Sequence, residues 1–261
     1  MRKTRVFQFL KKAGVVALCV SLLFGAFLPV TAQASGAHLV RNYNNGHPNF
    51  NRIAARDYAA RWVTTRNPAF SNFDGIGGNC TNFVSQALAA GGISFTTRVT
   101  SPTQNHWYYF SGGWGWGRTS SWTTASYFRR HFADNNEQGF RRSLQMRVYR
   151  PTDITTRIGG QTSNTDRGWN DLFNNIGAGD VVQFMRTSVP HPTSNAGTWE
   201  TFHSAIVHRK SLDDANGRVS MAQNSADGWR NLREVARNMI NTSNQDIIWF
   251  IIIRMNAVTT W

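Results

Sequence analysis

The stretch GNCTNFVSQALAAGGI, residues 78–93, places Cys80 directly after a glycine-rich loop and at the start of a helical pattern. Four apolar residues recur at the spacing of one helix face: Phe83, Val84, Ala87 and Leu88. The pair Gly91–Gly92 then ends the pattern. A helix N-terminus stabilises negative charge through its unpaired N–H groups and its dipole. The stretch therefore predicts a helix that carries an ionisable thiol at its first residue.

Residues 1–34 predict a secretory signal peptide. Five basic residues lie within residues 1–12, an apolar run follows over residues 13–30, and Ala32–Gln33–Ala34 has the small-residue pattern of a cleavage site. The apolar run is also long enough for an uncleaved membrane anchor, but the cleavage pattern favours removal. Cleavage would remove Cys19 and leave Cys80 as the one cysteine of a secreted, extracellular protein, which we expect to associate with the cell wall.

The mature chain is expected to be strongly basic. Five of the 28 basic residues lie in the signal peptide, so 23 remain against 14 acidic residues, a net charge of +9. These residues are almost all arginines, and they are scattered singly or in pairs rather than in runs typical of nucleic-acid binding. We therefore expect an anionic cell-wall polymer as a partner, no nucleic acid, and no stable membrane insertion once the signal peptide is removed.

The remaining residues are enough for one sizeable domain. Polar residues 35–49 predict a leader segment, and residues 50–261 predict the domain itself. Residues 50–66 have a helical pattern with Asn51 as a possible N-cap. The C-terminal third changes to strand patterns, in GDVVQFM, HSAIVHR, RVSMAQN and DIIWFIIIRM. Helices followed by strands predict an α+β fold, with N-terminal helices packed on a mostly antiparallel C-terminal sheet.

A thiolate nucleophile needs a nearby base, and the chain offers seven histidines: His38, His47, His106, His131, His191, His203 and His208. His203 opens the strand pattern HSAIVHR, which follows GDVVQFM along the chain. His208 belongs to the same strand pattern, but strand alternation points it to the opposite face. We therefore predict His203 as the base for Cys80.

A third residue must fix the tautomer of His203. If HSAIVHR and RVSMAQN pair as a hairpin, Asn224 lies near the level of His203, and we favour it; Gln223 and Asp227 remain alternatives. The Cys80 N–H and the Asn79 side chain are expected to hold the oxyanion. The sequence has no metal-ligand spacing such as H-E-x-x-H, so neither a metal nor another cofactor is expected.

The segment from residue 101 to residue 122 is rich in aromatic residues and glycine. Its tryptophans Trp107, Trp114 and Trp116 are candidates for lining a substrate groove, because flat rings pack well against peptides and sugars. An equally good interpretation is that they fill the core beside the cysteine helix.

The order of these motifs resembles that in the putative amidase domain family of secreted and cell-envelope bacterial proteins. The matching segments, which span roughly residues 50–235, are FNRIAARDYAARW, NPAF, NCTNFVSQALAAGG, HWYYF, SSWTT, GDVVQF and HSAIV. The family is similar to the circularly permuted papain-like hydrolases of the cell wall, the NlpC-type and CHAP peptidases. The resemblance implies a papain-like fold with Cys80 as nucleophile and His203 as base. Two positions depart from the family pattern: Asn79 replaces an Asp, and Asn224 replaces a His.

Together these features predict a secreted cysteine hydrolase that cleaves amide bonds in peptides of the peptidoglycan type. One alternative is a catalytically inactive domain of the same fold that binds cell-wall glycans. Another is an enzyme that acts on a different acyl group, as a transglutaminase-like or transpeptidase enzyme. The enzyme interpretations require an ionised, readily alkylated thiol, whereas a binding domain does not.

Overall fold

The computed structural model describes residues 37–43, 46–111, 117–134, 143–155, 163–187, 199–211, 218–241 and 248–257 of the 261-residue chain. Residues 35–261 belong to one compact unit. The predicted signal peptide, residues 1–34, lies outside the described residues. Within the ranges given above, every helix is too short or too polar to cross a membrane.

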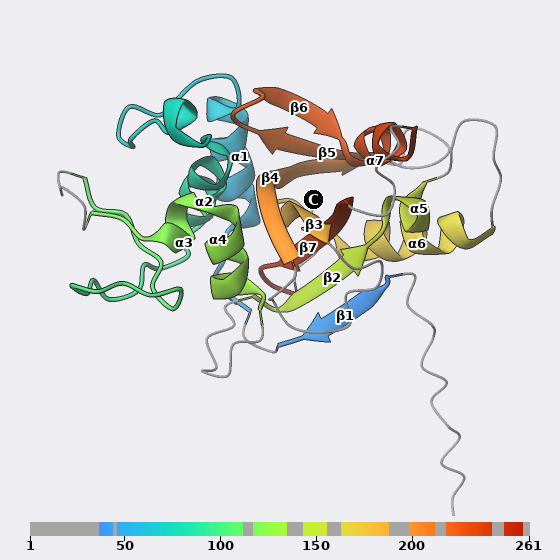
Figure 1. Cartoon of the computed structure of the whole chain (residues 1–261), viewed down its shortest axis with the longest axis horizontal. Coiled ribbons are helices and arrows are strands. Elements are labelled where there is room, and N and C mark those ends of the chain that lie inside the picture. The colour runs from blue at the N-terminus through green and yellow to red at the C-terminus, as the bar shows by residue number, and fades with distance from the viewer. Residues whose placement is uncertain are drawn as a thin grey trace, which may run out of the picture. The chain divides into compact units, whose positions relative to one another are not determined.

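The domain combines helices with one antiparallel sheet (Figure 1). The helical elements are α1 (Arg52–Trp62), η1 (Asp74–Ile76), α2 (Cys80–Ala90), α3 (Ser120–Thr123), α4 (Ala125–Phe132), α5 (Pro151–Ile154), α6 (Ser163–Asn175) and α7 (Leu232–Asn241). The strands are β1 (Leu39–Asn42), β2 (Gln145–Tyr149), β3 (Val181–Thr187), β4 (Trp199–Ser211), β5 (Arg218–Gln223), β6 (Gly228–Asn231) and β7 (Ile248–Arg254). They pair in the order β1-β2-β7-β3-β4-β5-β6, always antiparallel. The predicted α+β class is confirmed.

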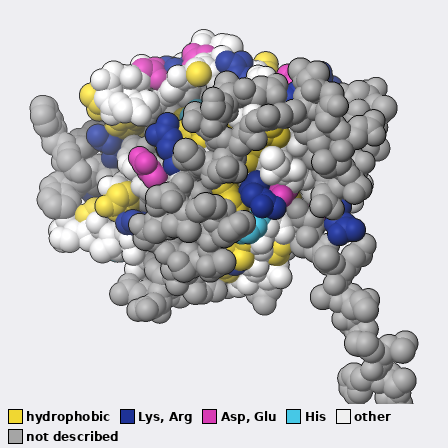
Figure 2. All heavy atoms as spheres, turned by 45° about the vertical axis from the view of Figure 1, so that its right-hand side comes forward, with side chains coloured by type: hydrophobic (Ala, Val, Ile, Leu, Met, Phe, Trp, Pro, Cys, Tyr) yellow, Lys and Arg dark blue, Asp and Glu magenta, His cyan; other side chains and the backbone are white. Residues whose placement is uncertain are grey.

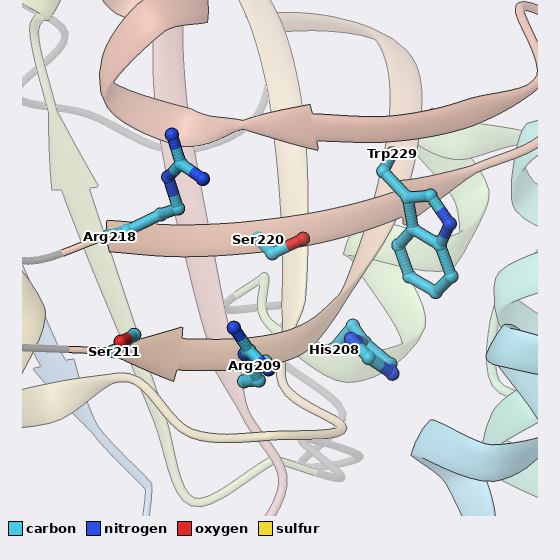
Figure 3. Close-up of a pocket in the computed structure, with 6 residues that line it drawn as sticks. All are labelled: His208, Arg209, Ser211, Arg218, Ser220 and Trp229. Atoms are coloured by element: carbon cyan, nitrogen blue, oxygen red, sulfur yellow. The ribbon is translucent and has the colours of Figure 1, made fainter. Parts of the chain in front are cut away.

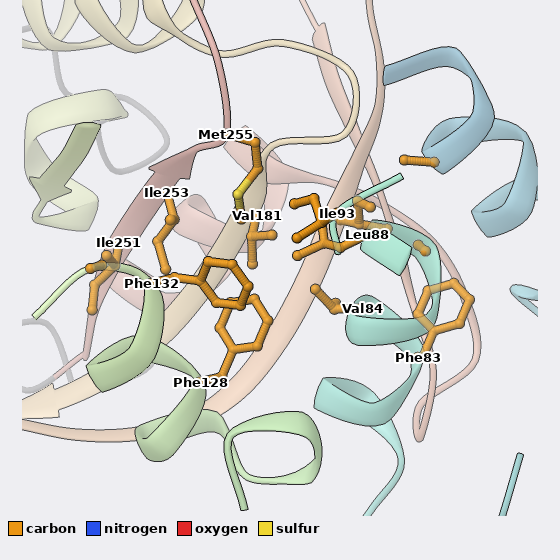
Figure 4. Packing of buried hydrophobic residues seen from close by; sticks show 14 of the residues in the cluster. Phe83, Val84, Leu88, Ile93, Phe128, Phe132, Val181, Ile251, Ile253 and Met255 are labelled. Atoms are coloured by element: carbon orange, nitrogen blue, oxygen red, sulfur yellow. The ribbon is translucent and has the colours of Figure 1, made fainter. Parts of the chain in front are cut away.

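Helices cover both faces of this sheet. One hydrophobic cluster joins α1, α2 and α4 to the sheet, and a second joins α5, α6 and α7 to it. Strand β7 contributes to both, because Ile251 and Ile253 lie in the first cluster and Phe250 and Ile252 in the second. Figure 4 shows Ile251 and Ile253 beside Phe128 and Phe132 of α4. Burial on both faces explains why this strand is an unbroken apolar run.

The segment expected as a leader is part of the sheet. Leu39–Asn42 form the edge strand β1, whose residues pair with those of β2. Farther along, the His47 N–H donates to the Met255 carbonyl at 2.8 Å. The domain thus extends beyond the predicted boundary at residue 50. This strand could not be predicted, because a four-residue edge strand with one packed apolar side chain, Leu39, has no detectable alternation.

Helix α1 begins as predicted, and its buried side includes an arginine. The Asn51 side chain caps it by accepting the Ala54 N–H at 2.9 Å, which confirms the predicted N-cap. Arg52 is buried and forms a 2.8 Å ion pair with buried Asp180, just before β3, while Ile53 is 39% exposed. Further hydrogen bonds satisfy the Arg52 guanidinium, at the Ala178 carbonyl and at Asn256. Such saturation is what a buried charge requires.

Candidate active site

The glycine-rich loop delivers the chain into α2 at Cys80. Gly77 and Gly78 have φ angles of 108° and 98°, a conformation that costs glycine little and other residues much. A side chain on Gly78 would also crowd Ser225, whose Oγ lies 3.2 Å from the position of a Cβ there. The loop can therefore turn tightly into the helix, and Cys80 is left 8% exposed at its first turn.

The polar residues of α2 are held by buried partners. The Thr81 and Ser204 hydroxyls lie 3.0 Å apart, and the side-chain oxygen of Asn82 accepts the Trp122 indole N–H at 2.7 Å. The Ser85 hydroxyl donates to the Trp122 carbonyl at 2.9 Å. Because each of these polar groups needs its partner, the helix can be buried almost all round only in one position. This network fixes where Cys80 lies.

The turn after β5 caps the start of α2. The Asn79 N–H donates to the Ser225 hydroxyl oxygen, and the Ser225 N–H donates to the Asp227 carboxylate at 3.0 Å. Among the described residues, Ser225 is the one non-glycine residue with a positive φ, 87°. Holding serine in this left-handed conformation costs free energy, so the surrounding contacts must impose it.

Arg66 supplies part of that constraint. Its guanidinium makes two hydrogen bonds to Asp74 in the loop, at 2.8 and 3.0 Å, and two to Asp227 in the turn, at 2.9 and 3.0 Å. Hydrogen bonding to Arg66 lowers the pKa of both carboxyl groups, which therefore stay ionised near neutral pH. One arginine thus clamps the loop before Cys80 to the turn that caps its helix.

Cys80 lies beside β4 at a level that β5 does not reach. The Val207 N–H donates toward β3, to the Asp180 carbonyl at 2.8 Å, so alternation along β4 directs the Ser204 N–H to the opposite side, where β5 would pair. Strand β5 ends at Gln223, before reaching that level. The Cys80 sulfur accepts a hydrogen bond from the Ser204 backbone there.

Cys80 and His203 shift one another's pKa values toward an ion pair. Burial raises the pKa of the Cys80 thiol, but the hydrogen bond and charge of His203, with the Ser204 N–H and the Thr81 hydroxyl, lower it below its ordinary value. Burial lowers the pKa of His203, but Cys80 and Gln223 raise it above the ordinary value. Both effects favour a thiolate beside an imidazolium.

Besides Cys80, Gln223 contacts the imidazole of His203. Its side-chain oxygen lies 3.1 Å from His203 Nε2, and its amide N–H donates to the Ala226 carbonyl at 2.8 Å. Because the second bond fixes which amide atom is the oxygen, His203 Nε2 must be the donor. Nδ1 is then the ring nitrogen left for Cys80. Gln223 was one of three residues that the sequence left open for this role.

Asn224 and Asn79 are engaged elsewhere. The Asn79 amide donates to the Asn224 side-chain oxygen at 2.7 Å, and the Asn224 amide donates to the Trp62 and Thr65 carbonyls at 3.1 and 3.3 Å. Asn224 is the first residue of the turn after β5, and these contacts hold its side chain against Asn79 and the end of α1. The two residues that depart from the family pattern, Asn79 and Asn224, thus contact each other. Together they join the end of α1 to the start of α2.

Of the three tryptophans predicted for a groove, the structure describes Trp107. Trp107 is fully buried, and its indole N–H donates to the Ser85 hydroxyl at 3.2 Å, so it belongs to the core beside the cysteine helix. Trp114 and Trp116 fall outside the described residues. Across the ranges that are described, no three His, Cys, Asp or Glu side chains gather as metal ligands would.

A family model identifies the family of the chain. Residues 49–252 match a family described as a putative amidase domain. The uncharacterized protein YhbB of Bacillus subtilis (strain 168) is 36% identical over 95 residues, which cover 35% of this chain and 26% of YhbB. The chain thus spans about a quarter of the length of this relative. No solved structure matches the chain.

Proposed function

Because the chain belongs to the putative amidase domain family, we propose that it is an exported cysteine hydrolase that cleaves amide bonds in cell-wall peptides. The family description supports amide hydrolysis. The cysteine mechanism, the papain-like relationship, the substrate and the export are our extension of it. The observation that carries the mechanism is the contact of Cys80 with His203 at the N-terminus of α2, where the two pKa shifts favour an ion pair.

In the first half of the reaction the Cys80 thiolate attacks the carbonyl carbon of the amide. The developing oxyanion is stabilised at the N-terminus of α2, where the Cys80 N–H has no acceptor within the helix. The Asn79 amide, expected to share this role, instead donates to Asn224. The C–N bond then breaks as the His203 imidazolium gives its proton to the leaving amine. The products of this step are a free amine and a thioester on Cys80.

In the second half, water hydrolyses the thioester. Neutral His203 takes a proton from the water as its oxygen attacks the thioester carbonyl, and the Cys80 thiolate leaves. The carboxylate product departs, and the ion pair of thiolate and imidazolium is restored. Gln223 serves as the orienting residue in place of Asn224, since its carbonyl oxygen can hold the Nε2 proton of His203 through both steps.

Two features of the sequence support the substrate class. The pattern of residues 1–34 supports export, and the excess of arginine supports attraction to the anionic polymers of a cell wall. Figure 2 shows the Lys and Arg side chains of one face in separate groups among hydrophobic and uncharged ones. Such a distribution suits a diffuse attraction to the wall rather than one tight contact.

The test is the rate of Cys80 alkylation by iodoacetamide between pH 4 and 9, on protein without residues 1–34. A lowered thiol pKa means that the thiolate persists as the pH falls, so we expect fast labelling well below the free-thiol pKa of about 8.5. His203→Ala should abolish this advantage, whereas His208→Ala, on the same strand, serves as the matched control and should keep it.

Fast, His203-dependent labelling would lead directly to a screen of peptidoglycan peptides as substrates. Labelling that follows an ordinary thiol and ignores His203→Ala would contradict the hydrolase. It would favour the alternative function, a wall-binding domain in which Cys80 is only a packed side chain.

A further inference from the structure

A cavity of about 220 Å³ lies on the β4–β5–β6 part of the sheet, distinct from the site at Cys80 (Figure 3). Its lining residues are His208, Arg209, Ser211, Arg218, Ser220 and Trp229. The cavity is smaller than the ~300–1,000 Å³ typical of sites for whole drug-sized ligands. It therefore suits one ring or one charged group of a larger molecule.

The strand register brings the polar groups of this cavity together. Arg209 pairs with Ser220, and Ser211 pairs with Arg218. Each guanidinium therefore comes from a position directly opposite a serine. The register shifts between Val207 and Arg209, and a shift of this kind turns the intervening side chain, His208, out of the regular alternation.

Trp229 closes one end of the cavity. It reaches from β6 toward His208 on β4, and Ser220 of β5 lies beside the two rings (Figure 3). The indole and imidazole centroids lie 4.4 Å apart, and the tryptophan is nevertheless 41% exposed. An exposed indole beside hydroxyl and guanidinium groups offers an apolar face to a sugar ring and polar groups to its substituents.

The charge of the cavity is positive. Arg209 and Arg218 are exposed, and the one described counterion of Arg218 is Glu234, at 3.9 Å, with both side chains more than half exposed. An ion pair of that kind contributes little and is easily displaced. Burial, with the nearby charges of Arg56 and Arg209, lowers the pKa of His208. The imidazole thus stays neutral near pH 7 and can act as a hydrogen-bonding partner among cations.

We propose that this cavity is a binding subsite for a phosphorylated sugar, with its phosphate on Arg209 and Arg218 and its ring on Trp229. Arginine binds phosphate through paired N–H donors, and the two serines add hydroxyl donors at the same level. Arg209 lies six residues after His203 on β4, which is about 20 Å along the strand. A phosphorylated polysaccharide bound here would hold the protein beside its polymer. This inference is independent of the proposed hydrolysis.

The experiment uses Cys80→Ala protein without residues 1–34, so that hydrolysis plays no part. N-acetylglucosamine 1-phosphate, inorganic phosphate and N-acetylglucosamine are titrated separately by calorimetry. We expect the sugar phosphate to bind more tightly than either of its parts. Arg209→Ala and Arg218→Ala should each weaken it about tenfold or more, since each removes hydrogen bonds to a charged group. Trp229→Ala should remove the preference for the sugar phosphate over inorganic phosphate.

Two matched controls test whether the effect belongs to the cavity. Arg98→Ala removes another exposed arginine, and Tyr127→Ala removes an aromatic residue of similar exposure, 38%. Circular dichroism establishes that each variant is folded. Equal loss of binding in Arg98→Ala and Arg209→Ala would overturn the proposal in favour of diffuse charge. Equal affinity for sugar phosphate and inorganic phosphate, unchanged by Trp229→Ala, would overturn it as well. A phosphodiester-linked polysaccharide, titrated last, distinguishes a polymer from a free sugar phosphate as the ligand.

Discussion

The β4–β5 hairpin carries two half-buried histidines with opposite electrostatic surroundings. His203 lies near the end at which β5 stops, and His208 lies five residues farther along β4. The pKa of His203 is raised above its ordinary value, while that of His208 is lowered. Burial acts in the same direction on both, so the difference must come from their partners.

The partners explain the difference. His203 faces a thiol that can become an anion and the carbonyl oxygen of Gln223, and both stabilise the protonated ring. His208 faces the cations Arg56 and Arg209, which disfavour a further positive charge, with Asp57 as a weaker opposing influence. One histidine is therefore suited to hold a thiolate and deliver a proton, and the other is suited to remain neutral. Residue type and strand are the same, and the neighbours decide the chemistry.

The largest expected effect separates the two histidines in hydrolysis. His203→Asn removes the general acid and base and should lower the rate on a cell-wall peptide by about 10²–10⁴-fold. His208→Asn should change it less than about twofold, because His208 contacts neither Cys80 nor its partners. The measurement is kcat/KM for both variants on one peptide. Similar losses in the two would break the comparison, since they would mean that the whole strand, rather than His203, supports the rate.

The next effect separates Gln223 from Asn224. Gln223→Ala removes a hydrogen bond to the charged form of His203, about 1.5–3 kcal/mol, and should slow hydrolysis about ten- to hundredfold. It should also move the upper limb of the pH–rate profile to lower pH, because Gln223 helps to raise the pKa of His203. Gln223→Glu keeps an acceptor and should restore part of the rate.

Asn224→Ala serves as the matched comparison in that series. It leaves buried groups of Asn79, Trp62 and Thr65 without their partner and should reduce the free energy of unfolding by about 1–3 kcal/mol. The folded fraction should keep its fast alkylation. If Asn224→Ala instead slowed alkylation while leaving stability intact, the assignment of Gln223 as orienting residue would be wrong.

A smaller effect tests how the turn after β5 is built. Ser225→Ala removes the oxygen that accepts the Asn79 N–H and keeps a side chain in the left-handed conformation, so it should cost about 1 kcal/mol of stability. Ser225→Gly removes the same oxygen but relieves the strain and should cost less. Urea unfolding measures both. The opposite order would show that the conformation of Ser225 carries no strain.

Much of the fold follows from the sequence, because its signals are local. The periodicity of residues 80–90 and the Gly91–Gly92 pair defined α2, and the β-branched runs defined β3, β4, β5 and β7. The inward face of α1 could not be predicted, because a buried arginine is tolerated only through Asp180, more than a hundred residues away. Strands β1, β2 and β6 were missed as well, since all three are short and interrupted by arginine.

The candidate site also has some residues that local sequence signals predict and others that they do not. Cys80 and His203 could be chosen from a helix start and a strand start. The choice between Gln223 and Asn224 depends on where β5 ends and which face each residue takes, and a shift of one residue reverses that face. The fate of Trp107 depended on Ser85, a partner on another helix. The papain-like relationship stays a prediction, because no solved structure matches the chain.

The smallest effect concerns the pH dependence of stability at His208. The pKa of His208 is lower in the folded than in the unfolded chain, so the unfolded chain binds the proton more readily. The folded state must therefore lose stability as the pH falls through the ordinary histidine value of about 6.5. His208→Gln lacks this proton and should lose less stability between pH 7 and pH 5. Because His208 is half-exposed, the gain should stay below about 0.5 kcal/mol.

Arg209→Ala should give part of the same gain by removing one of the repelling charges, and thermal unfolding at the two pH values measures both. If His208→Gln were more acid-sensitive than the parent protein, His208 would be favourably protonated in the fold, and the contrast with His203 would disappear.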